Sequence, residues 1–154
     1  MNTNTNANMD MSTNADKKSL EALIIRYQDE VLNGHRDDLL TEILHPDFRG
    51  ETDESALEME TQGDDIEAAR DFMVELRSKV AELRYTCTEM RWDGDVLRMR
   101  WTVGGIHTGT LMGFPPTGRR FTFSYPNWAR FKDGRIIAAQ SEWDEKELAA
   151  ILGA

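Results

Sequence analysis

The chain has 154 residues, of which 40% are hydrophobic and 30% are charged, and its formal net charge is -10. This length and composition predict one globular domain with a core of its own. The acidic balance argues against nucleic acid and anionic membranes as partners, because phosphate binding requires clustered Lys and Arg side chains.

Two features bear on the compartment. No apolar run approaches the roughly 20 residues of a membrane span, and the first residues lack the basic and apolar parts of a signal peptide, so we expect a cytoplasmic protein. The single cysteine, Cys87, cannot form an internal disulfide, and it sits in an alternating strand pattern that is typical of a small core residue.

The chain begins with a segment of biased composition. Residues 1–15 are rich in Asn, Thr and Met without periodicity, which predicts a disordered tail. Residues 16–154 are expected to form a single domain. At its start, apolar residues recur every three or four positions from Leu20 to Val31, which predicts an amphipathic helix that Asn33-Gly34 ends.

Two further helices are predicted before the strands begin. A short helix starts at Asp37 and stops at His45, because Pro46 disfavours a helical conformation in the residue before it. A third helix runs from about Ile66 to Leu83. Between these two helices, from Phe48 to Asp65, the chain is acidic and irregular. This composition predicts a solvated loop, with a mobile lid over a cavity as the alternative.

After the third helix the hydrophobic period changes from 3.6 to 2, which indicates antiparallel strands. Asp93-Gly94 and Asp133-Gly134 are strong hairpin signals. In the strand before the second hairpin, Pro126 predicts a bulge or an edge position, because proline cannot donate to a sheet. Asp144 is the expected N-cap of a final short helix.

The stretch from Ile106 to Arg120 is predicted to be a strand end, a tight turn and a return strand. Gly109 and Gly113 permit backbone conformations with positive φ, and Pro115-Pro116 cannot sit in a central strand. The order of the elements indicates an α+β fold. One curved antiparallel sheet wrapped around the helices would enclose a cone, and the inside of the cone is the natural place for an apolar pocket.

Several of these segments carry a family resemblance. They are His45-Pro46-Asp47-Phe48, the stretch from His107 to Arg119, the hairpin Asp133-Gly134-Arg135-Ile136 and the ending Leu152-Gly153. On these residues the chain resembles the SnoaL-like polyketide cyclase (ester cyclase) family of the nuclear transport factor 2-like superfamily. The resemblance covers roughly residues 19–153 and implies the α+β cone described above.

The resemblance also implies a chemistry. Characterised members of the family close a ring by intramolecular aldol condensation on an aromatic polyketide ester, need no metal or cofactor, and usually associate through the sheet. They use an Asp as general acid and base on the strand after the Asp-Gly hairpin and a His on the strand before it. By position, the family His falls on Asn127 and the family Asp on Ser141. Neither side chain exchanges protons near pH 7.

Four residues are candidates for the chemistry. A bulge at Glu142 would turn its carboxylate inward, where burial raises a carboxyl pKa and makes an acid or base; the alternative is an outward, solvated Glu. His107 could exchange a proton with a substrate, or bond the turn backbone as a structural residue. Asn127 and Ser141 could together hold a carbonyl or enolate oxygen, or simply bond to each other across the strands.

Other residues are assigned to binding and assembly. His35, His45 and His107 show no metal-ligand spacing, so no metal is expected. The predicted apolar lining of the pocket is Tyr27, Phe72, Trp101, Met112, Phe123, Tyr125 and Trp143. The outer sheet face would carry Arg98, Arg100, Thr102, Thr122, Trp128 and Arg130, an amphipathic surface suited to a homodimer or homotetramer.

Three functions are compatible with these residues. The favoured one is a cofactor-independent cyclase of secondary metabolism, an isomerase or lyase that acts on a hydrophobic, polyketide-like carbonyl compound, with proton transfer by Glu142 or His107. The second is a binding protein that holds a small hydrophobic ligand in the same cone without chemistry. The third is epoxide hydrolysis or epoxide-opening ring closure, which would also need Glu142 to face inward.

Overall fold

The first helix packs against the concave side of a sheet and changes its winding before it ends. The structure, a computed structural model, describes residues 16–50, 65–111, 113–142 and 144–153. The helix begins at Asp16 and continues as a π-helix, η1 (Tyr27–Leu32). Ile24 and Val31 of its predicted apolar stripe are 1% and 0% exposed, so the stripe faces the core. None of the helices in the described ranges is long and apolar enough to cross a membrane.

The predicted second helix is shorter than expected and leads directly into a strand. It consists of η2 (Asp37–Leu39) and α2 (Leu40–Ile43), and β1 (Leu44–Gly50) follows. The assignment of Phe48 to a loop is therefore wrong, because this residue lies in β1. The strand forms by parallel pairing with a segment near the end of the chain, a contact that no local pattern announces. Residues 51–64, the rest of the expected loop or lid, lie outside the described residues.

The third helix, α4 (Asp65–Lys79), ends before the predicted Leu83, and β2 (Val80–Asp93) begins at once. Val80 already pairs with His107 in the sheet. The residues just after β3 cap the end of α4. The backbone nitrogens of Thr108 and Gly109 donate to the Lys79 carbonyl at 3.0 and 2.9 Å. The segment from Val80 to Leu83, which the helical periodicity assigned to the third helix, is therefore part of β2.

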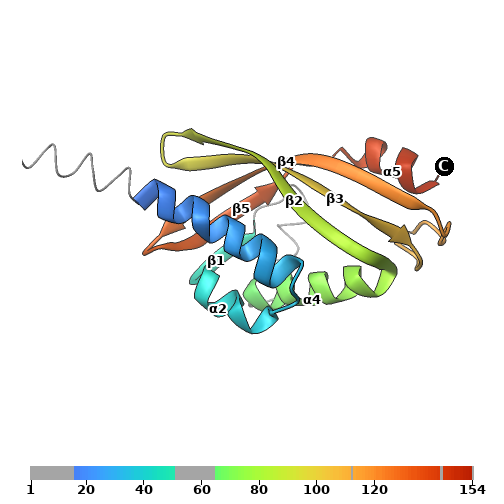
Figure 1. Ribbon diagram of the computed structural model, residues 1–154, viewed down its shortest axis with the longest axis horizontal. Coiled ribbons are helices and arrows are strands. Elements are labelled where there is room, and N and C mark those ends of the chain that lie inside the picture. The colour runs from blue at the N-terminus through green and yellow to red at the C-terminus, as the bar shows by residue number, and fades with distance from the viewer. Residues whose placement is uncertain (1–15, 51–64, 112, 143, 154) are drawn as a thin grey trace, which may run out of the picture.

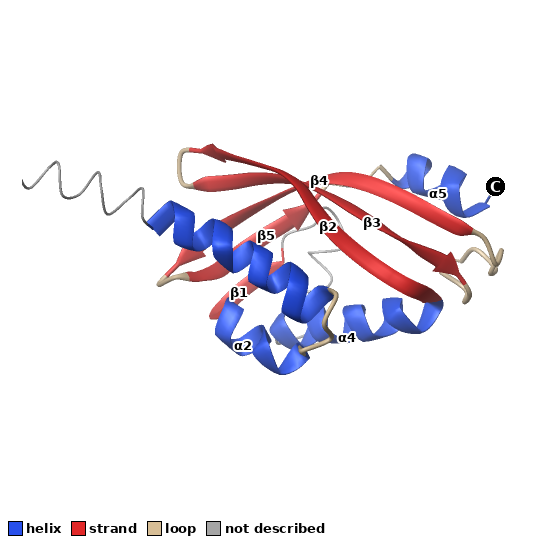
Figure 2. Ribbon diagram, viewed as in Figure 1, coloured by secondary structure: helices blue, strands red, loops and turns tan. Residues whose placement is uncertain are grey.

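The sheet has five strands in the order β1-β5-β4-β3-β2, with β3 (Val96–His107), β4 (Arg120–Lys132) and β5 (Arg135–Ser141) at its centre (Figures 1 and 2). It is a curved, unclosed sheet, and the predicted α+β fold is confirmed. The sheet is mixed rather than wholly antiparallel, because β1 runs parallel to β5. Both Asp-Gly hairpins form, and Gly94 and Gly134 adopt positive φ of 65° and 76° there.

Pro126 lies in a central strand, which corrects the prediction of a bulge or an edge. It pairs with Arg100 in continuous register between β3 and β4. The Pro126 carbonyl accepts from the Glu142 nitrogen at 2.9 Å, so the proline nitrogen also points to the β5 side, where that strand has just ended at Ser141. No donor is missed there, which is why proline is tolerated.

The last helix, α5 (Glu145–Gly153), lies apart from the other helices (Figure 1). As predicted, Asp144 caps it, because the Asp144 carboxylate accepts from the Lys146 nitrogen at 2.9 Å. Leu148 and Leu152 are 7% and 1% exposed and belong to the same core as the sheet and the first helix. The helix therefore adds apolar cover to the sheet instead of extending into solvent.

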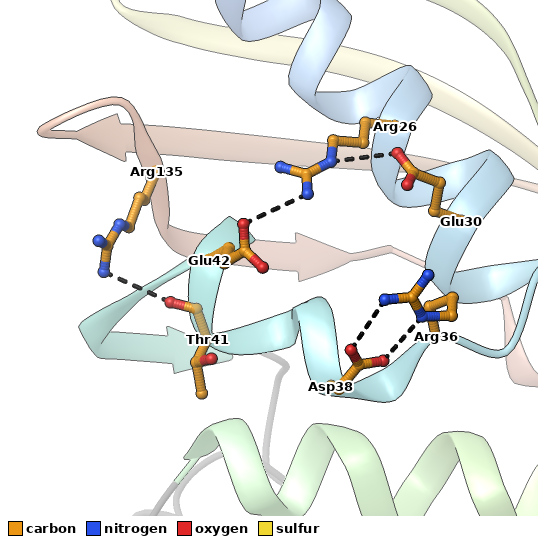
Figure 3. A network of polar contacts seen from close by, with 7 residues as sticks. All are labelled: Arg26, Glu30, Arg36, Asp38, Thr41, Glu42 and Arg135. Carbon is orange, nitrogen blue, oxygen red and sulfur yellow. Dashed lines mark hydrogen bonds and ion pairs between the residues drawn. The ribbon is translucent and has the colours of Figure 1, made fainter.

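Polar contacts tie the helical layer together and to the sheet. Figure 3 shows Arg26 bonded to Glu30 at 3.1 Å and to Glu42 at 3.3 Å, which links the first helix to α2. The Arg135 guanidinium of β5 donates to the Thr41 carbonyl at 3.4 Å in the same view. These groups are exposed, so the contacts fix the arrangement more than they add stability.

The edge strand β2 is covered by side chains of the first helix. The Asn33 side chain donates to the Tyr85 carbonyl and accepts from the Tyr85 nitrogen, both at 2.8 Å. The Gln28 side chain accepts from the Cys87 nitrogen at 2.7 Å. These contacts satisfy backbone groups that an edge strand would otherwise expose, and they bring η1 against the concave face at the level of Tyr85.

Candidate functional site

The concave face of the sheet is built from aligned rows of side chains, because partners in register share a face. One row joins Tyr85, Val103 and Phe123 of β2, β3 and β4. The next row joins Cys87, Trp101 and Tyr125. A third row is Met90, Met99, Asn127 and Ser141, and it adds β5.

Asn127 and Ser141 are direct partners across β4 and β5. This agrees with the prediction that both side chains could lie together on one face of the sheet. Asn127 Nδ2 donates to Ser141 Oγ at 3.0 Å and to the Gln140 carbonyl at 2.8 Å. Both side chains are half-buried. Since Ser141 Oγ is the acceptor in this pair, its own hydrogen remains available for a further acceptor. The pair can therefore present one oriented O–H donor to a ligand oxygen on the concave face.

Glu142 follows Ser141, but its side chain is exposed. The inward orientation required a bulge at this position. The register shift between β4 and β5 lies instead between Arg130 and Phe131, at the other end of the strand pair. The structure thus shows the outward, solvated alternative for Glu142. Glu142 therefore does not supply the inward carboxylate that both the buried acid/base role and the epoxide-opening role require.

His107 lies at the opposite end of β3 from the Asn127–Ser141 pair. Asn127 pairs with Met99, eight residues before His107, which puts the two backbones roughly 26 Å apart at about 3.3 Å per strand residue. His107 is 1% exposed, with Nδ1 3.4 Å from Thr117 Oγ1 and Nε2 without a partner among the described residues. This arrangement does not let His107 share a proton with the pair.

The other two histidines serve the fold. His45 Nδ1 accepts from the Asp47 nitrogen at 3.0 Å, and Nε2 lies 3.5 Å from the Asp133 carboxylate. His45 thus contacts a backbone nitrogen and a carboxylate of the turn between β4 and β5. His35 adopts a positive φ of 61° in the turn after η1.

The predicted apolar lining is only partly assembled on the concave face. Trp101, Phe123 and Tyr125 are 4%, 2% and 7% exposed, and the Phe123 and Tyr125 rings stack at 5.8 Å. Tyr27 is half-buried against the same core. Phe72 on α4 is 48% exposed, which its helical spacing did not indicate. Met112 and Trp143 lie outside the described residues.

Sequence reasoning missed three polar groups near this face. Tyr85 is 8% exposed and packs edge to face on Trp101 with ring centroids 6.4 Å apart. The half-buried pair Arg77 and Asp37 forms two hydrogen bonds of 2.9 and 3.0 Å. Tyr85 could have been found, because it shares the strand parity of Cys87; the ion pair could not, because its members are 40 residues apart.

Burial sets the protonation of the groups on this face. It raises the pKa of Tyr27 to about 12 and the pKa of the Cys87 thiol to about 11. Burial also raises the pKa of Tyr85 and Tyr125 well above the ordinary value for a phenol. These phenols and the thiol therefore stay neutral at physiological pH, where the phenols can donate hydrogen bonds and the thiol is a poor nucleophile.

A separate cleft of about 600 Å³ lies between the first helix and the β4–β5 hairpin. Its walls include Leu20, Leu23, Arg26, Phe131 and Asp133. Neither Asn127 nor Ser141 lines it. It brings together none of the predicted site residues, so we do not assign the chemistry to it.

On the convex face of the sheet, Trp128 differs from the prediction. Trp128 was expected to face a partner or solvent, yet it is 9% exposed. Its indole nitrogen donates to Gln140 Oε1 at 3.0 Å, and the Arg130 guanidinium lies 4.9 Å from the ring centroid. Neighbouring side chains of the same chain thus cover it. Association through this face remains a prediction.

Comparison with known proteins gives consistent results. The model of the SnoaL-like polyketide cyclase family matches residues 22–152. TsrD from Streptomyces laurentii is 25% identical with a TM-score of 0.71, and the alignment covers 91% of this chain and 96% of TsrD. No curated protein matches.

Two further solved structures share the fold. IdmH from Streptomyces antibioticus, a candidate polyketide cyclase, is 24% identical with a TM-score of 0.71, covering 88% of this chain and 99% of IdmH. AclR from Streptomyces galilaeus, a candidate hydroxylase, is 19% identical with a TM-score of 0.70, covering 87% and 80%. Proteins of one fold are thus associated with different reactions, and the reaction must be argued from the site.

Proposed function

Because the chain belongs to the SnoaL-like polyketide cyclase family, we propose that it binds a hydrophobic, polyketide-like carbonyl compound on the concave face and closes or isomerises a ring without a cofactor. The observation that carries the proposal is the Asn127–Ser141 pair, which presents a fixed O–H donor beside the aromatic row of Trp101 and Tyr125. Such a donor stabilises a carbonyl oxygen more strongly as negative charge develops on it.

The proposed step is an aldol ring closure. A proton leaves the carbon next to one carbonyl group, and the resulting enolate oxygen accepts from the Ser141 hydroxyl. The enolate carbon then bonds to a second carbonyl carbon of the same molecule, and the alkoxide formed there takes up a proton. Asn127 acts as a positioning residue, since its amide donates to Ser141 Oγ and so directs the hydroxyl hydrogen toward the ligand.

In the proposed mechanism Glu142 transfers the proton, acting as a solvated carboxylate at the end of β5 and not as the inward base expected from the sequence. It is the nearest carboxylate along the chain to the Asn127–Ser141 pair, so a ligand would have to extend to the end of β5 to meet it. His107 is not used, because its backbone lies roughly 26 Å from that of Asn127.

The test measures proton exchange, which does not require knowledge of the natural substrate. The protein is mixed with 2-acetylnaphthalene in heavy water, and NMR follows the replacement of the methyl protons by deuterium. We expect catalysed exchange in the wild type and its loss in E142Q, with binding of the ketone retained. Full exchange in E142Q would remove Glu142 from the mechanism, and a protein that binds the ketone without exchange would not be a cyclase of this kind.

A second candidate, a binding protein without chemistry, rests on the same pair. Neither Asn127 nor Ser141 titrates near physiological pH, and Glu142 is exposed. Such a protein would bind 2-acetylnaphthalene with an affinity that barely changes between about pH 5 and 8, since no histidine or raised carboxyl group would contact the ligand.

A further inference from the structure

Two phenol hydroxyls on the concave side have no assigned role. Tyr27 begins η1, and Tyr85 lies in β2 with only 8% of its surface exposed. Across the described ranges, neither hydroxyl makes a hydrogen bond, although buried hydroxyls nearly always have a partner. Of the described side-chain atoms, His107 Nε2 is the one that is both fully enclosed and unpartnered. The two phenol oxygens are therefore not fully enclosed by the protein.

The fold holds these two residues near each other from different elements. Asn33, just after η1, bonds both backbone groups of Tyr85 at 2.8 Å, and Gln28 bonds the Cys87 nitrogen at 2.7 Å. Tyr27 is close enough to Tyr85 for a charge on one ring to affect the other. Tyr27 is the first residue of the π-helix η1, and π-helical turns are rare and often found at functional sites.

The neighbouring charges define what these hydroxyls can bind. Arg77 lies near both phenols, but its guanidinium is taken up by Asp37 at 2.9 and 3.0 Å and by the Val31 carbonyl at 2.9 Å. The arginine is thus neutralised and saturated on that side. Among the described residues, a carboxylate or phosphate would therefore meet no uncommitted cation beside the two phenols, whereas a neutral oxygen would meet two O–H donors.

We propose that the Tyr27 and Tyr85 hydroxyls form a subsite that donates hydrogen bonds to a neutral oxygen of the ligand, such as a ketone, quinone or ester carbonyl. The subsite rests on the proposed function only in using the same concave face. Tyr85 pairs with Val103 and Asn127 with Met99, so the two donor groups start from backbone positions roughly 13 Å apart along the strand direction and two strands apart across the sheet. The ligand class is therefore an extended apolar compound with oxygen atoms at both ends.

The experiment compares two ligands of one shape. 2-Acetylnaphthalene carries a carbonyl acceptor, and 2-ethylnaphthalene does not. Titration calorimetry gives both affinities, and infrared spectroscopy of the bound ketone reports hydrogen bonding as a lowered carbonyl stretch. The variants are Y27F and Y85F, which keep the rings. S141A removes the other donor, and T102V removes a hydroxyl that is bonded to Ser124 on the same sheet and away from the concave rows.

We expect the wild type to bind the ketone about 3- to 10-fold more tightly than the hydrocarbon. Y27F and Y85F should reduce this preference and raise the carbonyl stretch, while their affinity for 2-ethylnaphthalene stays unchanged, which also verifies folding. T102V should leave the preference intact. The ketone has a single oxygen, so it can occupy the tyrosine subsite or the Ser141 donor but not both at once. A preference that Y27F and Y85F reduce and S141A does not supports the subsite, while proton exchange reports only the ketone bound at Ser141.

Three outcomes would overturn the subsite. They are no binding of the ketone, no preference for it in the wild type, and a preference that S141A abolishes while Y27F and Y85F preserve it. The last outcome leaves the proposed function standing, because it assigns the carbonyl to Ser141. If the wild type shows the tyrosine-dependent preference but no catalysed proton exchange, the proposed function fails and the subsite stands.

Discussion

The effect of having Asn127 and Ser141 at the family acid/base positions can be tested by building a titrating pair there. The family His and Asp fall on Asn127 and Ser141, whose side chains are 3.0 Å apart. The double variant N127H/S141D would place an imidazole and a carboxylate at this distance. The His Nδ1 atom stands where Asn Nδ2 stands, one bond beyond Cγ, so it can keep the hydrogen bond to the Gln140 carbonyl or donate to the new carboxylate.

The expected gain follows from general acid–base catalysis, which contributes about 100- to 10,000-fold when a base of suitable pKa meets the reacting carbon. We expect exchange of the 2-acetylnaphthalene methyl protons to rise within this range, with a rate that depends on the ionisation of the new pair. The cost in stability should be about 1–2 kcal/mol, because one neutral hydrogen bond is replaced in a half-buried place.

The matched control is the swapped variant, N127D/S141H, which has the same two residues in the opposite positions. If the geometry of the family site is retained, the exchange rate should rise less in N127D/S141H than in N127H/S141D. Equal gains in both would show that any added base at the rim suffices. No gain in either, with ligand binding and folding intact, would refute the view that a missing acid/base pair limits the reaction at this site.

Three further predictions concern stability and assembly. N33A should destabilise the fold by about 1–3 kcal/mol in urea unfolding, because two buried backbone groups of Tyr85 lose their partners, and Y85F should not. The raised pKa of Tyr27 means that the unfolded chain loses the phenol proton first, so stability should be constant below about pH 10 and fall as pH rises toward about 12; Y27F should remove part of this slope in unfolding curves measured by fluorescence. Association through the convex face should appear as a dimer or tetramer in sedimentation, and R98E/R100E should make it monomeric, whereas a wild-type monomer would contradict the prediction.

The sequence by itself determined the elements whose cause is local. The apolar stripe from Leu20 to Val31 and the two Asp-Gly hairpins follow from backbone geometry and the conformational freedom of glycine, and both appear in the structure. The inward parity of Asn127 and Ser141 was also readable, because side chains alternate strictly along a strand. Family membership was inferred from short local motifs, among them the stretch from His107 to Arg119, and the family model confirms it.

Tertiary structure alone decided which candidates meet. Whether Leu44–Gly50 is a strand depends on β5, whose paired residues Ile136 to Ala139 come much later in the chain, and the end of α4 depends on the β3 partner of Val80. Parity could not tell that His107 and Asn127 lie at opposite ends of one strand pair, nor that the bulge of β5 lies far from Glu142. The pairing of strands and the packing of η1 on β2 fix these distances, because local periodicity sets the face of a residue but not its neighbours.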